Sequence, residues 1–217
     1  CLDSMIDMDT YKPFYFCFTN KAFDLKTNKE VQVKREDYIS ITTGYPYEKP
    51  PAEKVALVKK LVEQILAKKD VRDCYISILR TCMNGNLQQK FVLASGNGGN
   101  GKGLINGLLK IMLGLYACKA DVKSYTEKLK SGANPEVAKM NFKRAVLSQE
   151  PPSNSQLVCS NLKQFTGDDE VTARNNYSNN TKVELMATHL MECNILPKFD
   201  EELNDALVRR FILIMFE

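Results

Sequence analysis

Hydrophobic positions follow a helical period in the first half of this chain. Between Ala52 and Lys69, apolar side chains recur every three or four residues, with lysines and Glu63 opposite, which predicts an amphipathic helix. A second helix is predicted from Asp70 to about Met83, where Asn84-Gly85 is a stop signal. We expect both helices to serve as a packing platform for the segment that follows.

Short apolar runs further along the chain are typical of buried strands. They are Lys90–Ala94, Arg144–Ser148, Met186–Cys193 and Arg210–Phe216. Helices are predicted at Leu104–Met112 and at Ser155–Phe165, between these runs. Strands that alternate with helices predict an α/β fold with a largely parallel sheet flanked by helices, and with sites at the carboxyl ends of the strands.

Two other regions have β character of a different kind. Cys1–Tyr47 is rich in aromatic and β-branched residues and predicts a small β-rich lead-in, which the proline-rich Tyr45–Pro51 ends as a linker. Val171–Tyr177 and Thr181–Leu185 flank Ser178-Asn179-Asn180, which predicts a hairpin. We therefore divide the chain into a lead-in with linker (1–51), a small helical subdomain (52–88) and an α/β core (89–217).

Length and composition limit the class of protein. The 217 residues can bury one good core, and 44% hydrophobic with 26% charged residues is typical of globular proteins. No apolar run approaches the roughly 20 residues that span a bilayer, and no signal peptide opens the chain, so we expect no membrane partner. A start at Cys1 and an end within an apolar run suggest a fragment of a longer protein.

Charge and cysteine content change this picture little. The net charge of +4 is compatible with nucleic acid as a partner but does not identify one. Seven cysteines without a C-x-x-C pair, and the single His189, do not indicate a zinc site. Free thiols in a reducing compartment are the interpretation we prefer.

A glycine-rich loop lies between the first strand of the core and the helix after it. Gly96, Gly101 and Lys102 fit the pattern G-x-x-x-x-G-K of a phosphate-binding loop. Glycines let backbone N–H groups surround phosphate oxygens, and the helix N-terminus and the lysine add positive charge. A flexible turn of glycine and asparagine is the alternative, which the strand, the helix and the lysine in register disfavour. The predicted ATP-binding residues are Gly96, Gly98, Gly99, Asn100, Gly101, Lys102, Gly103 and Leu104.

Gly103 departs from the common phosphate-loop pattern. Serine or threonine usually stands there, and its hydroxyl is a ligand of Mg²⁺. Gly103 keeps its backbone N–H but has no hydroxyl. Either a water takes that place on the metal or hydrolysis is weak, and the sequence leaves both open.

Three polar features beyond the loop gain chemical meaning together. Glu150 follows a strand, where an acid can orient water or hold Mg²⁺, so it is the candidate metal ligand. Asn194 ends another strand, and its amide could contact the attacking water or the γ-phosphate. Arg209-Arg210 precedes the last strand, where a guanidinium could act as an arginine finger. Singly, a solvated acid, a turn residue and a surface ion pair explain them as well.

The order of these features resembles the superfamily 3 helicases. The phosphate loop and Glu150 are followed by LKQFTGDDEVTAR (Leu162–Arg174), the hairpin, Asn194-Ile195-Leu196-Pro197 and ALVRRF (Ala206–Phe211). Among these helicases, the chain is most similar to the poxvirus-type primase-helicases of large DNA viruses, phages and plasmids. The resemblance is strong from Asp70 to Glu217 and weaker before Pro51.

The resemblance implies a P-loop NTPase core of the AAA+ type that uses ATP and Mg²⁺. Such cores assemble as a homo-oligomer, a hexameric ring, and hydrolyse ATP between subunits. Lys102 would contact the β- and γ-phosphates, Glu150 would work with water and Mg²⁺, and Asn194 would be the polar sensor. Arg210 would be the finger that reaches the neighbouring subunit, with Arg209 as the alternative.

The hairpin Ala173–Leu185 resembles the pore hairpin with which the family grips single-stranded DNA. Its candidate DNA-binding residues are Arg174, Tyr177, Asn179 and Lys182. Because the tip is rich in asparagine, hydrogen bonding and stacking by Tyr177 would replace charge. The resemblance also implies a primase domain upstream on the full-length chain.

We therefore predict an enzyme, the ATP hydrolase and helicase core of a viral or plasmid replication protein that translocates on single-stranded DNA. It would act inside the cell, in the host cytoplasm or nucleus if it is viral. The alternative, which Gly103 favours, is a nucleic-acid-binding ATP switch with weak or no hydrolysis. A P-loop kinase is disfavoured because no acceptor-site or lid signature is visible.

Overall fold

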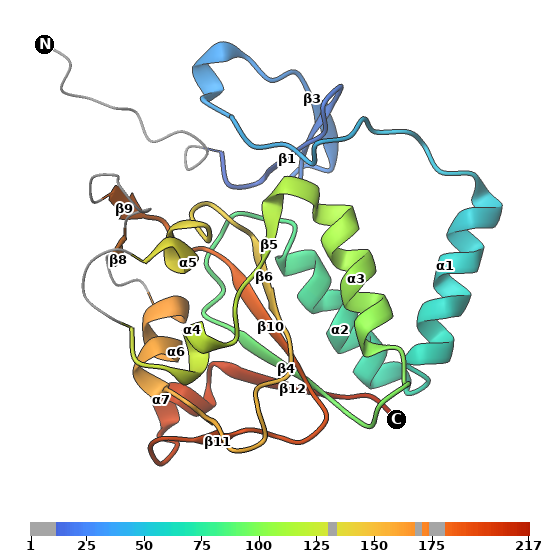
Figure 1. The fold of residues 1–217 in the computed structure, drawn as a ribbon. Coiled ribbons are helices and arrows are strands. Elements are labelled where there is room, and N and C mark those ends of the chain that lie inside the picture. Colours follow the sequence, from blue (N-terminus) through green and yellow to red (C-terminus); the bar gives the residue numbers. More distant parts are fainter. Residues whose placement is uncertain (1–11, 130–133, 168–170, 174–180) are drawn as a thin grey trace, which may run out of the picture.

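A five-stranded parallel sheet forms the centre of this chain (Figure 1). The computed structural model describes residues 12–129, 134–167, 171–173 and 181–217. The strand order is β12-β4-β10-β6-β5, and all neighbours run parallel. The strands are β4 (Phe91–Ser95), β5 (Ala117–Lys119), β6 (Ala145–Ser148), β10 (Thr188–Cys193) and β12 (Phe211–Met215). The predicted parallel sheet is confirmed; β5, at its edge, was not predicted.

Helices cover both faces of the sheet, so that the core has three layers (Figure 1). On one face lie α1 (Ala52–Ile65), α2 (Lys69–Thr81) and α3 (Lys102–Leu113), followed by the 3-10 turn η2 (Gly114–Tyr116). On the other lie α4 (Lys123–Thr126), α5 (Pro135–Ala138), α6 (Cys159–Thr166) and α7 (Asp205–Val208). In the part of the chain described, no helix is long and apolar enough to cross a bilayer.

Alternate residues of each strand face the two helical layers, as the two-residue period of a strand requires. Val92 and Ala94 of β4 pack with Tyr75 of α2 and Ile105 of α3 in one core cluster. Phe91 and Leu93 belong to the second cluster, on the other face of the sheet. The predicted helices α1 to α3 are confirmed, and α2 shares its core with the sheet. The division at residues 51 and 88 stays a prediction.

The predicted β-rich lead-in is confirmed, and it forms a three-stranded antiparallel sheet. Its strands are β1 (Tyr15–Cys17), β2 (Ala22–Asp24) and β3 (Lys29–Val31), followed by the 3-10 turn η1 (Arg35–Asp37). Arg144, which is buried, ties this sheet to the core: its Nη2 donates to Tyr15 O (2.7 Å) and its Nη1 donates to Met83 O (2.5 Å). The lead-in is therefore anchored by buried hydrogen bonds and not only by its linker.

The prediction of a helix at Ser155–Phe165 was wrong for the residues before Cys159. Gln156–Leu157 forms a strand, β7, that pairs in parallel with β11 (Lys198–Phe199), and α6 begins only at Cys159. The Cys159 amide donates to Asp200 Oδ1 (2.8 Å), so a carboxylate more than 40 residues away satisfies the first turn of the helix. The predicted hairpin is confirmed as β8 (Val171–Ala173) paired antiparallel with β9 (Thr181–Val183).

His189 of β10 lies fully buried between two aromatic rings. Its ring stacks on Phe91 (7°, centroids 6.1 Å apart) and on Phe165 (16°, 5.7 Å), and Nδ1 is 2.8 Å from the Tyr125 hydroxyl. Burial lowers the pKa of His189 to about 4, because a charged imidazole would lose its hydration there. This histidine is therefore a core residue that stays neutral at physiological pH.

We expect acidification to destabilise the fold through His189. Above pH 6.5 the imidazole is neutral whether folded or unfolded. Between pH 6.5 and about 4 only the unfolded chain gains the proton, so the free energy of unfolding should fall by about 1.4 kcal/mol per pH unit. Since this is the only histidine in the sequence, its NMR resonances report the pKa directly.

The matched variant is His189→Phe, which keeps an aromatic ring but cannot titrate. It should be less stable at pH 7, because the Tyr125 hydroxyl loses its partner. Its urea midpoint should nevertheless change less between pH 6.5 and 5 than that of the parent chain. An imidazole that titrates near pH 6.5 in the folded protein would contradict this account.

Candidate nucleotide site

Two glycines of the loop between β4 and α3 have positive φ angles and leave no room for a Cβ unless neighbouring atoms move. Gly96 has φ +152°, and a Cβ there would lie 2.1 Å from the carbonyl oxygen of Phe216. Gly101 has φ +87°, and a Cβ there would lie 2.8 Å from Cγ1 of Ile65. The loop is therefore a tight fold held between the C-terminal strand and α1, with the N-terminus of α3 directly behind it.

The Lys102 side chain is buried inside this loop. Only 6% of the residue is exposed, and Nζ donates to the carbonyl oxygens of Gly96 (2.5 Å) and Asn97 (3.1 Å). It also lies 3.2 Å from Oδ1 of both Asn100 and Asn194. The ammonium is thus satisfied by neutral oxygens, which a phosphate group could displace without breaking an ion pair.

Asn194 joins the loop lysine to the predicted acid. Its Oδ1 accepts from Lys102 Nζ, while its Nδ2 donates to Glu150 Oε2 (2.8 Å). Its backbone N–H donates to Glu150 Oε1 (2.7 Å). Three residues that are far apart in the sequence therefore meet at the carboxyl ends of β4, β6 and β10, as predicted for the site.

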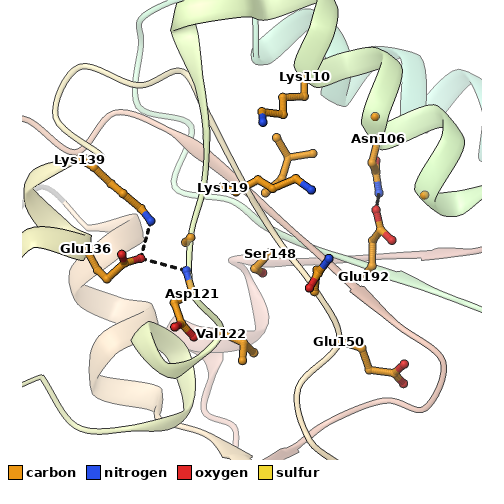
Figure 2. A pocket seen from close by; sticks show the side chains of 15 residues that line it. Asn106, Lys110, Lys119, Asp121, Val122, Glu136, Lys139, Ser148, Glu150 and Glu192 are labelled. Atoms are coloured by element: carbon orange, nitrogen blue, oxygen red, sulfur yellow. Dashed lines mark hydrogen bonds and ion pairs between the residues drawn. The ribbon is translucent and has the colours of Figure 1, made fainter.

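A cavity of about 680 Å³ opens beside these residues (Figure 2). Its lining includes Gly103 at one end of α3, together with Glu150 and Glu192. Lys110, Lys119 and Lys139 also line it. This volume is within the range of small-molecule sites, and the mixture of carboxylates and lysines suits a charged ligand better than an apolar one.

The remaining loop residues differ in exposure. The Asn100 side chain is fixed, since its Nδ2 donates to Phe216 O (3.0 Å). Gly98, Gly99, Gly103 and Leu104 are exposed to solvent. Their backbone groups are accessible to a ligand, which is what a phosphate cradle requires.

Three residues near the loop were not predicted from the sequence. Tyr75 of α2 donates from its hydroxyl to Asn106 Oδ1, and Asn106 Nδ2 donates to Glu192 Oε1 (2.9 Å). Figure 2 shows the Asn106 amide pointing at the Glu192 carboxylate. A signal for Glu192 was present: it is the only charged residue within the strand Thr188–Cys193.

The candidate arginine fingers, Arg209 and Arg210, lie at the amino-terminal ends of the strands, whereas the glycine-rich loop follows the carboxyl end of β4. β12 pairs with β4 in register, from Phe211 beside Phe91 to Met215 beside Ser95. Four residues of a strand span about 13 Å, so Arg210 lies at least that far from its own phosphate loop. Its Nη1 donates to Ala206 O, whereas Arg209 is exposed. The structure therefore does not bring either arginine to Lys102 of the same chain.

One of the four predicted DNA-binding residues lies in a described strand. Lys182 lies in β9, opposite Thr172 of β8. Arg174, Tyr177 and Asn179 lie outside the described residues. Their roles at the hairpin stay predictions.

Comparison with known proteins identifies relatives of this chain. It is 30% identical over 204 residues to a "Putative helicase" of Acanthamoeba polyphaga mimivirus, which covers 92% of this chain and 21% of the relative. It is 27% identical over 225 residues to "Primase D5" of Fowlpox virus, covering 98% of this chain and 28% of the relative. This chain is a homologue of viral helicases and primases. The resemblance to the superfamily 3 helicases is thereby confirmed.

A solved structure shares the fold of this chain. The apo structure of the NrS-1 C-terminal region matches with a TM-score of 0.60 and 21% identity, over 79% of this chain and 40% of that one. No family model matches the chain. The chain spans between about a fifth and just over a quarter of the length of the two viral relatives named above. The relatives support a helicase-type role, and the finer roles of the site residues stay predictions.

Replacing the loop lysine should remove most nucleotide binding. Lys102→Ala deletes the one buried cation of the loop, and charge-assisted contacts of this kind contribute about 1.5–3 kcal/mol. We therefore expect ATP affinity to fall by about tenfold to a hundredfold in a calorimetric titration.

The control is Lys110→Ala, an exposed lysine that lines the same cavity on the same helix. It should change affinity less, because it lies two turns away from the loop. Circular dichroism must show that both variants fold. Equal ATP affinity in Lys102→Ala and the parent protein would contradict the prediction that this loop binds a nucleotide.

Proposed function

We propose that this chain is the ATP-hydrolysing core of a replicative DNA helicase. The observation that carries the proposal is the contact of Asn194 with both Lys102 and Glu150 at the carboxyl end of a parallel sheet. A lysine, an acid and a polar amide in contact at a phosphate-type loop are what a nucleotide hydrolase requires. The relatives named as helicase and primase support the same reading.

The residues present fit a nucleoside triphosphate with Mg²⁺. The loop turns at two glycines whose positions exclude a Cβ, and this leaves backbone N–H groups at the helix N-terminus for phosphate oxygens. Glu150 is exposed in the adjoining cavity and would hold the metal. Mg²⁺, when bound, would neutralise charge on the β- and γ-phosphates.

The three side chains of the site would then have distinct roles. Lys102 would exchange the loop carbonyls for the β- and γ-phosphate oxygens, which keeps its charge satisfied. Glu150 would orient a water, because a carboxylate oxygen can accept its proton as it attacks. Asn194 contacts both groups, so a change at the phosphate would alter its hydrogen bonds to Glu150 as well. This makes Asn194 suited to sense the γ-phosphate.

In an oligomeric ring, the arginines at the amino-terminal ends of the strands could contact the nucleotide of a neighbouring subunit. Because Arg210 lies about 13 Å or more from its own loop, it could serve only the loop of a neighbouring subunit. The family resemblance suggests a hexamer, single-stranded DNA held by the hairpin, and a primase domain upstream on the full-length protein. These remain parts of the proposal.

A second function is favoured by one residue. Gly103 lacks the hydroxyl that usually binds Mg²⁺, so the chain could be a nucleic-acid-binding ATP switch that hydrolyses poorly. The ATPase rate of the full-length protein, with and without single-stranded DNA, separates the two. Hydrolysis that single-stranded DNA stimulates supports the helicase. ATP binding without DNA-stimulated hydrolysis supports the switch.

Removing Arg210 should slow hydrolysis without preventing ATP binding. A finger supplied by a neighbour contributes about 10³–10⁵ in rate, so Arg210→Ala should lose about a thousandfold or more. When it is mixed with Lys102→Ala subunits, some activity should return, because a mixed interface can pair an intact loop with an intact finger. The measurement is the ATPase rate against the mixing ratio.

Arg209→Ala is the matched comparison, since it is the adjacent and more exposed arginine. If Arg210 only stabilises the turn through its bond to Ala206 O, its loss costs about 1 kcal/mol of stability and little activity. Normal turnover in both variants, or no recovery at any mixing ratio, would contradict a site shared between subunits.

An apolar stripe on α3 supports assembly next to the nucleotide site. It runs from Leu104 beside the loop to Ile111, which is 71% exposed, and Leu115 of η2 continues it. Ile111→Lys should therefore shift the assembly toward monomers while the fold stays intact, as mass photometry and circular dichroism can measure. Val33→Lys, a comparable change on an exposed apolar residue of the N-terminal lead-in, should leave the assembly unchanged.

A further inference from the structure

Glu192 is the only acidic residue of strand β10, which ends beside the glycine-rich loop. It lies two residues after Leu190, so both face α3, and Leu190 is buried in the core cluster that α3 shares. Glu192 itself is half-buried. Since a partly buried carboxylate costs free energy unless it is satisfied, its surroundings must provide partners.

One carboxylate oxygen is held in place by a chain of hydrogen bonds. Oε1 accepts from Asn106 Nδ2 at 2.9 Å, and Asn106 Oδ1 accepts from the Tyr75 hydroxyl. Asn106 is 1% exposed and Tyr75 is fully buried, so these donors cannot turn to solvent. Side chains from α2, α3 and β10 thus fix the direction of Glu192.

The second oxygen is directed at the position where the loop lacks a side chain. Oε2 lies 3.6 Å from the place that a Cβ on Gly103 would occupy, and among the described residues no other atom outside the adjoining backbone of α3 and the neighbours of Gly103 lies within 4 Å of that place. Within the described residues, Oε2 accepts no hydrogen bond and no lysine or arginine pairs with the carboxylate. The carboxylate therefore faces Gly103 without a lysine or arginine in direct contact, although Lys110 and Lys119 line the same cavity.

Such a charge would repel a nucleotide unless a cation stood between them. Phosphate oxygens and a carboxylate are both negative, and at short range in a cavity their repulsion is large. Mg²⁺ prefers oxygen ligands and is commonly held by one or two carboxylates together with phosphate oxygens. The orientation of Glu192 is thus unfavourable to a bare nucleotide and favourable to one with a metal.

We propose that Glu192 provides the metal-binding oxygen that Gly103 does not. The carboxylate of β10 takes over the place of the loop hydroxyl, and Tyr75 and Asn106 position it. Glu150 remains the acid on the other side of the cavity. This inference rests on the proposed function, because it assigns a residue to the metal of the same nucleotide site.

The test compares nucleotide binding with and without Mg²⁺ in the full-length protein. Glu192→Gln keeps an oxygen that accepts from Asn106 but loses the charge. Titration with ADP and with AMP-PNP should show weaker binding in Mg²⁺ and stronger binding in EDTA than in the parent protein. The Mg²⁺ concentration at half-saturation should rise about tenfold, a loss typical of altered metal sites.

A compensating change distinguishes a ligand from a structural residue. The double variant Gly103→Ser/Glu192→Gln places a hydroxyl beside the lost carboxylate, in space that only Glu192 borders. It should recover most of the Mg²⁺ dependence. Glu202→Gln, an exposed acid elsewhere, is the control and should behave as the parent protein. If Glu192 only positioned Asn106, Glu192→Gln would not bind nucleotide more weakly in Mg²⁺ and more strongly in EDTA, and adding Gly103→Ser would not restore the Mg²⁺ dependence.

The outcomes separate this inference from the proposed function. If the parent protein binds no nucleotide at any Mg²⁺ concentration, the proposed function fails and this assignment fails with it. If it binds MgADP but Glu192→Gln has the same Mg²⁺ half-saturation, only the role of Glu192 is overturned. Should Glu192→Gln not fold, Gly103→Ser alone decides: a small change supports Glu192, and a large gain in Mg²⁺ affinity overturns it.

Discussion

Strand β4 is hydrogen-bonded in parallel to β10 on one side and to β12 on the other, and this pairing positions the whole candidate site. Because parallel strands in register end at the same edge, the loop after β4 and Asn194 after β10 are adjacent. β6 pairs with β10 in the same direction, which brings Glu150 to that edge. The register must be kept, since a slip of one residue would turn each strand's buried side chains to the other face.

The second constraint is electrostatic. The chain buries a lysine near an acid without an ion pair between them: Lys102 is satisfied by carbonyl and amide oxygens, and Glu150 by Asn194. Neutral partners can be exchanged at lower cost than charged ones, so such a loop can bind and release an anion. Asn194 is central to this arrangement, because its amide group satisfies the lysine and the acid at the same time.

The carboxyl and amino ends of the strands hold different kinds of residues. The carboxyl edge holds the phosphate loop and its acids, while Arg209 and Arg210 precede β12 at the amino edge. A single chain cannot bring these edges together, since the strands between them are rigid. If the arginines act on a nucleotide, a second subunit must provide it, and the exposed apolar stripe on α3 gives such a subunit a surface beside the loop.

The sequence by itself determined the local parts of this protein. The glycine-rich loop between β4 and α3, the helices α1 to α3, the buried strands and the positions of Glu150 and Asn194 at strand ends could be predicted, because each depends on neighbouring residues and on a regular period. The hairpin and the β-rich lead-in were predicted for the same reason. The role of the loop in binding phosphate stays a prediction. The strands β5, β7 and β11 were missed, since each is only two or three residues long and pairs in parallel with a segment far away in the sequence.

Only the tertiary structure decided which polar groups meet. Tyr75 and Asn106 are 31 residues apart and Asn106 and Glu192 are 86 apart, so no local pattern joins them. The same holds for α6, whose start is set by Asp200. Side-chain contacts over such separations depend on how helices pack on the sheet, and it is this packing that directs Glu192 at Gly103.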